Sequence, residues 1–174
     1  MSNETQLNQR VINANVELHT QLADKYRDEP HFRPENVEKV EARILDLTKR
    51  TQAKRLLDLG CGTGFIINIA KHHVQEIVGV DVTTAMLDQI DTVGPANIKL
   101  HQTDAATFSE GEGTFDIVTA YSFLHHLYDI EPVLRTAYRS LRQGGVFYAD
   151  LDPNFEFWEA IAALNPSGKH DPIV

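Results

Sequence analysis

The sequence predicts an α/β fold, a doubly wound and mostly parallel sheet covered by helices on both faces. From residue 54 onward, short apolar runs with strand character alternate with segments of helical periodicity. The first run ends in three glycines at alternate positions, Gly60, Gly62 and Gly64, and a helix-like segment follows at once. The second run ends in Asp81, about twenty residues after the first glycine, which is the spacing of ribose-binding α/β domains.

The composition is that of one globular domain with a substantial core, because 174 residues with 42% apolar and 24% charged residues are ordinary values. We expect an N-terminal helical cap segment over residues 1–50 and a core over residues 51–174. The net charge of −9 disfavours a nucleic-acid partner, since such partners usually meet a basic patch. No apolar run is long enough to span a membrane. Cys61 is the single cysteine and cannot form an intrachain disulfide, so we expect a cytoplasmic protein.

Two helices are expected before the first strand. The spacing of Leu7, Val11 and Leu18 permits an amphipathic helix near the N-terminus. Two prolines make residues 27–34 a turn-rich connector. The second helix is expected over residues 34–50, because proline is favourable in a first helical turn.

The alternation of strands and helices continues to the end of the chain. Strands are expected at residues 55–59, 76–81, 98–102, 115–120 and 146–151. Helices are expected at residues 65–73, 84–91, 131–141 and 153–164, with a helical turn after residue 104 and a shorter helical piece at 123–128. This alternation implies right-handed crossovers between parallel strands.

The glycine loop is the first candidate binding site. Glycines permit positive φ and let a ligand approach the main chain without meeting a Cβ, and the following helix presents unpaired N–H groups. A dinucleotide fingerprint would place its third glycine one residue later, where Phe65 stands. A phosphate-binding P-loop would need Lys followed by Ser or Thr, and neither follows. A glycine turn without a ligand is the alternative.

The stretch D-L-G-C-G-T-G, residues 58–64, resembles motif I of the class I S-adenosylmethionine-dependent methyltransferases. The resemblance implies a Rossmann-like methyltransferase fold with strand order 3-2-1-4-5-7-6. The chain ends without an apolar run for the hairpin of strands six and seven, so we expect either a reduced version of the fold or a fragment of a longer chain. Residues 146–151 would then form an edge strand, which we expect a partner chain or the last residues to cover.

The resemblance also implies contacts with S-adenosylmethionine as cofactor. Motif I would contribute Asp58, Gly60, Cys61, Gly62 and Gly64. We expect the side chain of Cys61 to be present because it is small enough for a tight turn, and this interpretation is favoured over a role of its thiol as a nucleophile.

Two further acids would hold the nucleoside part of the cofactor. The two carboxylate oxygens of Asp81 would accept hydrogen bonds from the ribose hydroxyls, with Val82 also contacting the cofactor, and Asp104, with Ala105, would bind adenine. A helix cap is the alternative for each acid, and at Asp104 both roles are compatible.

The fourth strand leads into Y-S-F-L-H-H-L, residues 121–127, which resembles motif IV of small-molecule methyltransferases such as those of ubiquinone and menaquinone biosynthesis. Tyr121 and Ser122 would line the region of the sulfonium and the methyl acceptor. His125 is the candidate general base, with helix packing as the alternative. Adjacent histidines do not favour one shared metal, so no metal is expected. Tyr26 would close over the methionine part of the cofactor, or pack as a half-buried helix aromatic.

The predicted function is methyl transfer from S-adenosylmethionine to a small-molecule acceptor. A module or fragment that binds the cofactor without catalysis is the second hypothesis. A nicotinamide-dependent oxidoreductase is the third, and Phe65 in place of the last glycine argues against it.

Overall fold

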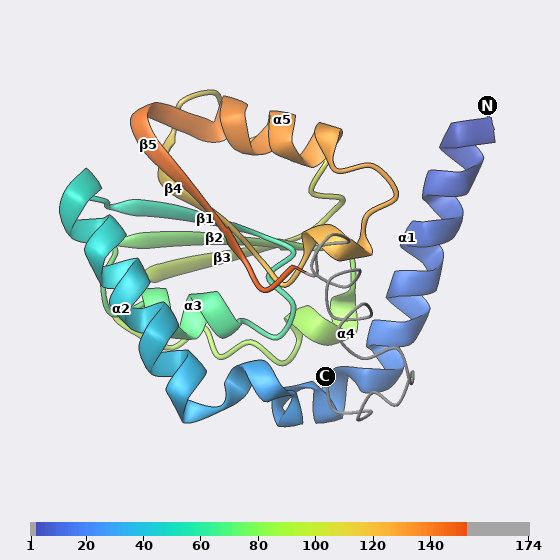
Figure 1. The fold of residues 1–174 in the computed structure, drawn as a ribbon, viewed down its shortest axis with the longest axis horizontal. Helices are drawn as coiled ribbons and strands as arrows, with labels where there is room; N and C mark the ends of the chain where they lie inside the picture. Colours follow the sequence, from blue (N-terminus) through green and yellow to red (C-terminus); the bar gives the residue numbers. More distant parts are fainter. Residues whose placement is uncertain (1–2, 153–174) are drawn as a thin grey trace, which may run out of the picture.

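The computed structural model describes residues 3–152 and shows a three-layer α/β arrangement (Figure 1). The chain begins with α1 (Asn3–Leu22), the 3-10 helices η1 (Ala23–Asp28) and η2 (Pro30–Phe32), and α2 (Pro34–Thr51). The core then follows in the order β1 (Arg55–Leu59), α3 (Phe65–Ala70), β2 (Glu76–Asp81), α4 (Thr84–Leu87), β3 (Asn97–Gln102), β4 (Phe115–Tyr121), η3 (Leu124–His126), α5 (Glu131–Ser140) and β5 (Leu141–Asp150). Among the described helices, none combines the length and apolar character needed to cross a lipid bilayer.

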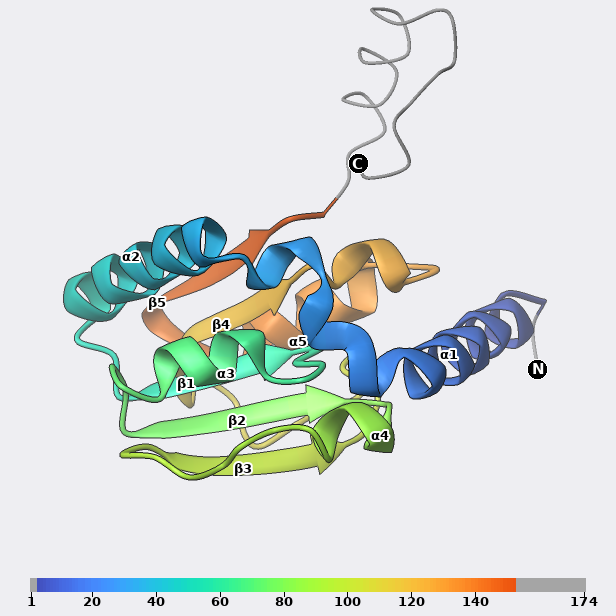
Figure 2. The ribbon, with the colours of Figure 1, turned by 90° about the horizontal axis from the view of Figure 1, so that it is seen from below.

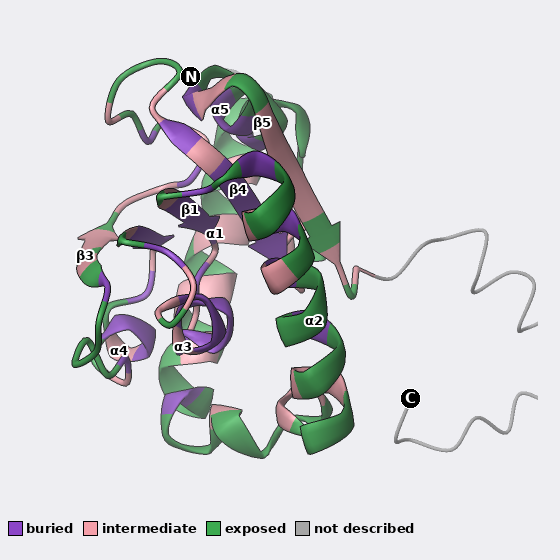
Figure 3. Ribbon diagram, turned by 90° about the vertical axis from the view of Figure 1, so that its left-hand side faces the viewer, coloured by how far each residue is buried: buried purple, intermediate pink, exposed green. Residues whose placement is uncertain are grey.

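The five strands form one parallel sheet in the order β3-β2-β1-β4-β5, which confirms the predicted fold class and the predicted order of the first five strands. Alternate residues of β1 point to opposite faces, as the pleat of a strand requires. Leu56 packs in the core that α2 and α3 cover, and Leu57 packs in the core that α5 covers. Figure 2 shows α2 and α3 together on one side of the sheet, and Figure 3 shows that the buried residues concentrate in the sheet and in α3.

Several predicted boundaries were wrong. The helix predicted at 65–73 ends at Ala70, and the helix predicted at 84–91 is the single turn α4. After Leu87 the backbone N–H groups of Gln89 and Ile90 bond three residues back instead of four, so the turn tightens and the helix ends. The strand predicted at 146–151 already begins at Leu141, and a register shift in its pairing with β4 accommodates the extra residues.

Among the strands of residues 3–152, β5 lies at an edge of the sheet, as predicted, because β4 is its one neighbour there. The helix predicted at 153–164 lies outside the described residues.

Asp116 on β4 is the centre of a hydrogen-bond network that joins β4 to the start of β1, to β5 and, through Arg142, to α2 at the amino end of the sheet. Its Oδ2 accepts hydrogen bonds from the backbone N–H groups of Lys54 (2.7 Å) and Arg55 (2.8 Å), and Oδ1 accepts from Arg142 on β5. The Arg142 guanidinium also donates to the carbonyl of Thr51, the last residue of α2 (2.6 Å). Burial acts to raise the pKa of Asp116, but Arg142 and the two backbone donors outweigh it and lower the pKa.

Asp116→Ala is expected to lower the free energy of unfolding by about 2–4 kcal/mol, because it leaves partly buried donors and a guanidinium without their acceptor. The lowered pKa means that the ionised carboxylate stabilises the fold at neutral pH and that this contribution is lost as the pH falls. Urea unfolding measures the difference. Glu112→Ala removes an exposed acid nearby and should change stability by no more than about 0.5 kcal/mol; equal losses in the two variants would contradict the role of Asp116.

Candidate functional site

The glycine loop is held by the carboxyl end of β2. The backbone N–H groups of Gly60 and Cys61 both donate to the carbonyl of Val80, at 2.8 and 3.0 Å. Gly60, Gly62 and Gly64 have φ values of 70°, 51° and 85°, which confirms the predicted positive φ at all three. A side chain would strain each of these conformations, so the motif requires glycine for backbone reasons alone.

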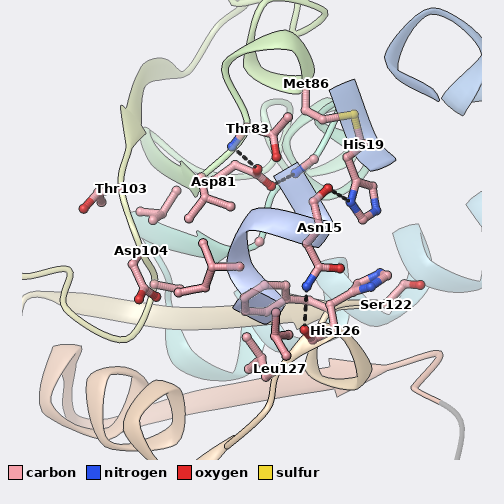
Figure 4. Close-up of a pocket in the computed structure, with 18 of the residues that line it drawn as sticks. Asn15, His19, Asp81, Thr83, Met86, Thr103, Asp104, Ser122, His126 and Leu127 are labelled. Carbon is pink, nitrogen blue, oxygen red and sulfur yellow. Dashed lines mark hydrogen bonds between the residues drawn. The ribbon is translucent and has the colours of Figure 1, made fainter. Parts of the chain in front are cut away.

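Asp81 completes this clamp at the end of β2 (Figure 4). Its Oδ2 accepts from the N–H of Gly62 (2.9 Å), and its Oδ1 accepts from the N–H of Thr83 (2.8 Å). Thr83 is the residue before α4, so this second bond closes a turn that leads into the helix, and Asp81 does not cap the helix itself. The carboxylate is thereby fixed in one orientation at the wall of a cavity.

The cavity lies at the carboxyl ends of the strands and is partly open to solvent. Its walls come from the glycine loop, the ends of β2, β3 and β4, and one face of α1. The predicted cofactor-binding residues that line it are Tyr26, Gly60, Gly62, Asp81, Val82, Asp104, Ala105 and Ser122.

A smaller cavity adjoins the first and brings in the predicted residues Asp58, Cys61 and Tyr121. The two cavities share the lining residues Tyr26, Gly60, Gly62 and Ser122. The hydroxyl of Thr63, in the wall of the smaller cavity, is buried without a hydrogen-bond partner among the described residues. A buried hydroxyl of this kind provides a hydrogen-bonding group for a ligand or a water.

Asp58 is almost fully buried in β1, with 2% of its surface exposed. The hydroxyl of Thr119 donates to its Oδ1 at 2.6 Å. Burial raises the pKa of Asp58 to about 7, although the Thr119 bond acts to lower it, and the negative charge of Asp81 adds to the rise. The group therefore changes its ionisation near neutral pH.

Asp104 follows β3, and its position is compatible with both expected roles, binding adenine and capping a helical turn. Its Oδ1 accepts from the N–H of Ala106 (2.8 Å), and its carbonyl accepts from Thr107 and Phe108 (3.0 and 3.1 Å), so it organises a local turn. The same residue lines the larger cavity.

Ser122 follows β4 with φ of 51°, an uncommon conformation for a residue other than glycine. Its N–H donates to the carbonyl of Asp150, at the end of β5 (2.9 Å). This bond secures the position of a residue that borders both cavities.

Two predicted residues lie outside both cavities. Gly64 is closely packed by Ile90, since a Cβ at Gly64 would lie 3.1 Å from that side chain. His125 has its Nδ1 2.8 Å from Oδ1 of Asp152, and the same oxygen accepts the backbone N–H of His125 (3.2 Å). The structure therefore does not bring His125 to the cavity wall, where its neighbour His126 is found.

The sequence did not single out the contribution of α1 and His126 to the site. Asn15 on α1 donates to the carbonyl of His126 (2.8 Å), and the rings of His19 and His126 lie 4.8 Å apart (Figure 4). Burial, followed by the neighbouring His125 and His19, lowers the pKa of His126 to about 4, so its imidazole is neutral at pH 7. Helical spacing was the available signal, because Asn8, Asn15 and His19 recur on one face of α1.

Within residues 3–152, no three His, Cys, Asp or Glu side chains come together in a way that could hold a metal ion.

A family model described as "Methyltransferase domain" matches residues 57–149, which is more than half of the chain. The chain belongs to this methyltransferase family. The matched segment contains the glycine loop, Asp81, Asp104 and the turn after β4, so the resemblance seen in motif I and motif IV to the class I S-adenosylmethionine-dependent methyltransferases is confirmed.

Relatives with recorded names agree with this assignment. The chain is 31% identical over 141 residues to the uncharacterized methyltransferase YcgJ of Bacillus subtilis, with 75% of this chain and 54% of YcgJ covered. It is 27% identical to the ubiquinone biosynthesis O-methyltransferase of Pseudomonas fluorescens, with 92% of this chain and 75% of the relative covered. The chain thus spans about half the length of the first relative and three quarters of the second.

Solved structures show the same fold. The YcgJ crystal structure has a TM-score of 0.59 at 22% identity and covers 74% of this chain and 68% of YcgJ. The DhpI–SAH complex has a TM-score of 0.63 at 17% identity and covers 80% of this chain and 68% of DhpI.

The stability of the ligand-free protein is expected to depend on Asp58. Its folded-state pKa is raised from 3.8 to about 7, so the folded state holds an extra proton in this window and stability falls as the pH rises through it. Asp58→Asn removes this penalty and should be more stable than the wild type at pH 8, by at most about 4 kcal/mol, with a much smaller difference at pH 5. Thermal or urea unfolding at both pH values tests this. Asp88→Asn, at an exposed position, should show no such pH dependence, and a pH-independent difference for Asp58→Asn would contradict the raised pKa.

The two loop glycines that line the cavities are expected to differ in their tolerance of a methyl group. A Cβ at Gly60 would lie 2.1 Å from a ring carbon of Phe123, whereas at Gly62 the nearest atom, Met86 Cε, would be 3.6 Å away. Gly60→Ala should cost about 3 kcal/mol or more from overlap and strain together, and Gly62→Ala about 1–2 kcal/mol from φ alone. Equal losses on urea unfolding would mean that Phe123 moves aside at little cost.

Proposed function

We propose that this chain transfers a methyl group from S-adenosylmethionine to a small-molecule acceptor. The observation that carries the proposal is the Asp81 carboxylate, which is fixed by Gly62 and Thr83 at the wall of a cavity beside a glycine loop. A rigid pair of acceptor oxygens at the end of the second strand suits two adjacent ribose hydroxyls. Gly62 leaves the main chain open beside it, because the nearest described atom outside its chain neighbours, Met86 Cε, would lie 3.6 Å from a Cβ there.

The residues present fit the three parts of this cofactor. Asp81 and Val82 would hold the ribose, and Asp104 and Ala105 would hold the adenine. The smaller cavity would take the amino-acid part, and its chemistry supports this placement. It contains the carboxyl of Asp58 and the buried, unpartnered hydroxyl of Thr63, which suit an ammonium group and a carboxylate.

When bound, the cofactor supplies a methyl group already activated by a sulfonium. The chain's own task is then to orient two reactants and to exclude water, for which no protein nucleophile is needed. Tyr26 and Ser122 border both cavities and would lie near the reacting groups. We assign no general base: His125 lies off the cavity beside Asp152, and His126, with a pKa of about 4, is a weak base at neutral pH.

A small acceptor is supported by the walls of the larger cavity. None of the described residues that line it is Lys or Arg, whereas the walls include Asp81 and Asp104. A phosphate-backbone partner would meet only negative charge there. The ubiquinone-biosynthesis relative, whose name states an O-methyltransferase activity, supports a small-molecule acceptor as well.

A cofactor-binding module without catalysis is the second candidate, because no general base is assigned among the described residues that border the cavities. Three expectations stay predictions: the division of the chain into a cap segment (residues 1–50) and a core (residues 51–174), the coverage of the β5 edge by a partner or by residues 153–174, and a cytoplasmic location. The last of these rests on the single cysteine.

Calorimetry with S-adenosylhomocysteine tests the site. Asp81→Asn should weaken binding about tenfold or more, because one charge-assisted acceptor for the ribose is lost. Asp88 is an exposed acid directly after α4 that borders neither cavity, so Asp88→Asn should leave binding unchanged.

A transfer assay with labelled S-adenosylmethionine over a panel of small acceptors separates the two candidates. Methyl transfer supports the enzyme, whereas tight binding with no transfer supports the module. A wild-type protein that binds neither S-adenosylmethionine nor S-adenosylhomocysteine would overturn both.

A further inference from the structure

We propose that the outer side of α1 is an interaction surface for a second copy of this chain, which packs against it as an antiparallel helix. The two-copy contact goes beyond the proposed function and does not depend on it. Figure 2 shows α1 projecting from the body of the molecule, with its N-terminal part beyond the sheet. α1 is 20 residues long and has no buried residue. Helices of a folded domain ordinarily gain most of their stability from a buried apolar face, which α1 lacks.

An apolar stripe follows one side of the helix. Leu7, Val11, Ala14 and Leu18 recur at intervals of four, three and four residues, the spacing of a helix–helix seam. Leu7 and Leu18 are 38% and 50% exposed, Ala14 is exposed, and Val11 is half-buried beside the cavity. The stripe therefore continues from the cavity wall onto the free side of α1.

The order of side chains along the stripe favours an antiparallel copy. The intervals read the same in both directions, so antiparallel pairing sets Leu7 against the partner's Leu18 and Val11 against the partner's Ala14. Each layer then contains two apolar side chains, and the contact is repeated by two-fold symmetry. The positions that would form the next layers are polar, Glu4 and Gln21, which ends the apolar seam and fixes its register.

Charge supplies a second, independent argument. Arg10 and Glu17 precede Val11 and Leu18, so both lie on the same, solvent-facing border of the stripe. Neither forms an ion pair within residues 3–152. In the antiparallel pair Arg10 faces the partner's Glu17, and the symmetry makes this ion pair twice. A parallel pair would offer Arg10 only asparagines at the facing border.

A lipid surface fits the stripe less well. Interfacial helices bind anionic lipid through Lys and Arg on their polar face. Glu4, Arg10 and Glu17 are the acidic and basic residues of α1, so the helix carries a net negative charge, and the whole chain carries −9.

The test is the oligomeric state of the full chain by sedimentation velocity or light scattering over a concentration series. A single helix pair is a small interface, so a dimer with a dissociation constant on the order of micromolar is expected. Leu18→Glu should weaken it about a hundredfold or more, because each dimer loses two leucine contacts. Thr20→Glu adds the same charge to an exposed position on the other side of α1 and should leave the dimer unchanged.

The charge pair gives a test that does not depend on removing apolar contacts. Arg10→Glu and Glu17→Arg should each weaken the dimer several-fold, and the double variant should restore it. Circular dichroism checks that the helix content is unchanged in every variant.

A wild-type chain that stays monomeric at about 100 µM, well above such a dissociation constant, would overturn the proposal. So would a dimer that Leu18→Glu leaves intact, or a double charge swap that fails to restore association. A monomeric chain that binds anionic vesicles would identify a membrane as the occupant of the stripe and would equally overturn it.

Discussion

The site depends on the way the end of β2 holds the glycine loop. Three successive N–H groups, from Gly60, Cys61 and Gly62, donate to two successive residues of β2: the first two to the carbonyl of Val80 and the third to the carboxylate of Asp81. These bonds fix the loop against the sheet and at the same time fix the carboxylate. Backbone that lines a binding cavity must have its polar groups satisfied in this way, because an unpaired N–H would cost about as much as a lost hydrogen bond.

Negative charge dominates this end of the sheet. The negative charge of Asp81 adds to the burial that raises the pKa of Asp58, and the larger cavity brings in Asp104 as well. The cost of gathering these carboxylates falls mainly on Asp58, which is buried inside β1. A ligand that carries a cationic group and several hydroxyl or amino donors would relieve that cost. The ligand-free protein holds the site at some expense of stability, as binding sites often do.

Local sequence pattern was sufficient for the strands and for the glycine loop, but not for the hydrogen bonds by which Val80 and Asp81 hold that loop. The positive φ values of the glycine loop and the places of Asp81 and Asp104 at the strand ends could be predicted, since each depends on residues close together in the chain. The strand order joins segments far apart in the chain and was predicted from the family resemblance. Helix lengths could not, because α4 ends where its hydrogen bonding tightens after Leu87, and no proline or glycine marks that point. The choice between His125 and His126 depends on which way a single 3-10 turn presents them, and adjacent positions in a sequence carry no such information. The role of α1 in the cavity wall depends on contacts more than a hundred residues apart, such as that of Asn15 with His126.

β5 contributes no side chain to either cavity, yet a hydrogen bond to β5 holds Ser122, which borders both cavities. The bond from Ser122 N–H to the Asp150 carbonyl holds the residue after β4 in a left-handed conformation that it would leave if released, since such a conformation costs roughly 1–2 kcal/mol outside glycine. The geometry of the site therefore requires the chain up to the end of β5. A recombinant piece that stopped at Tyr128, after β4, would contain every described residue that borders the cavities and would still lack the geometry that makes them a site.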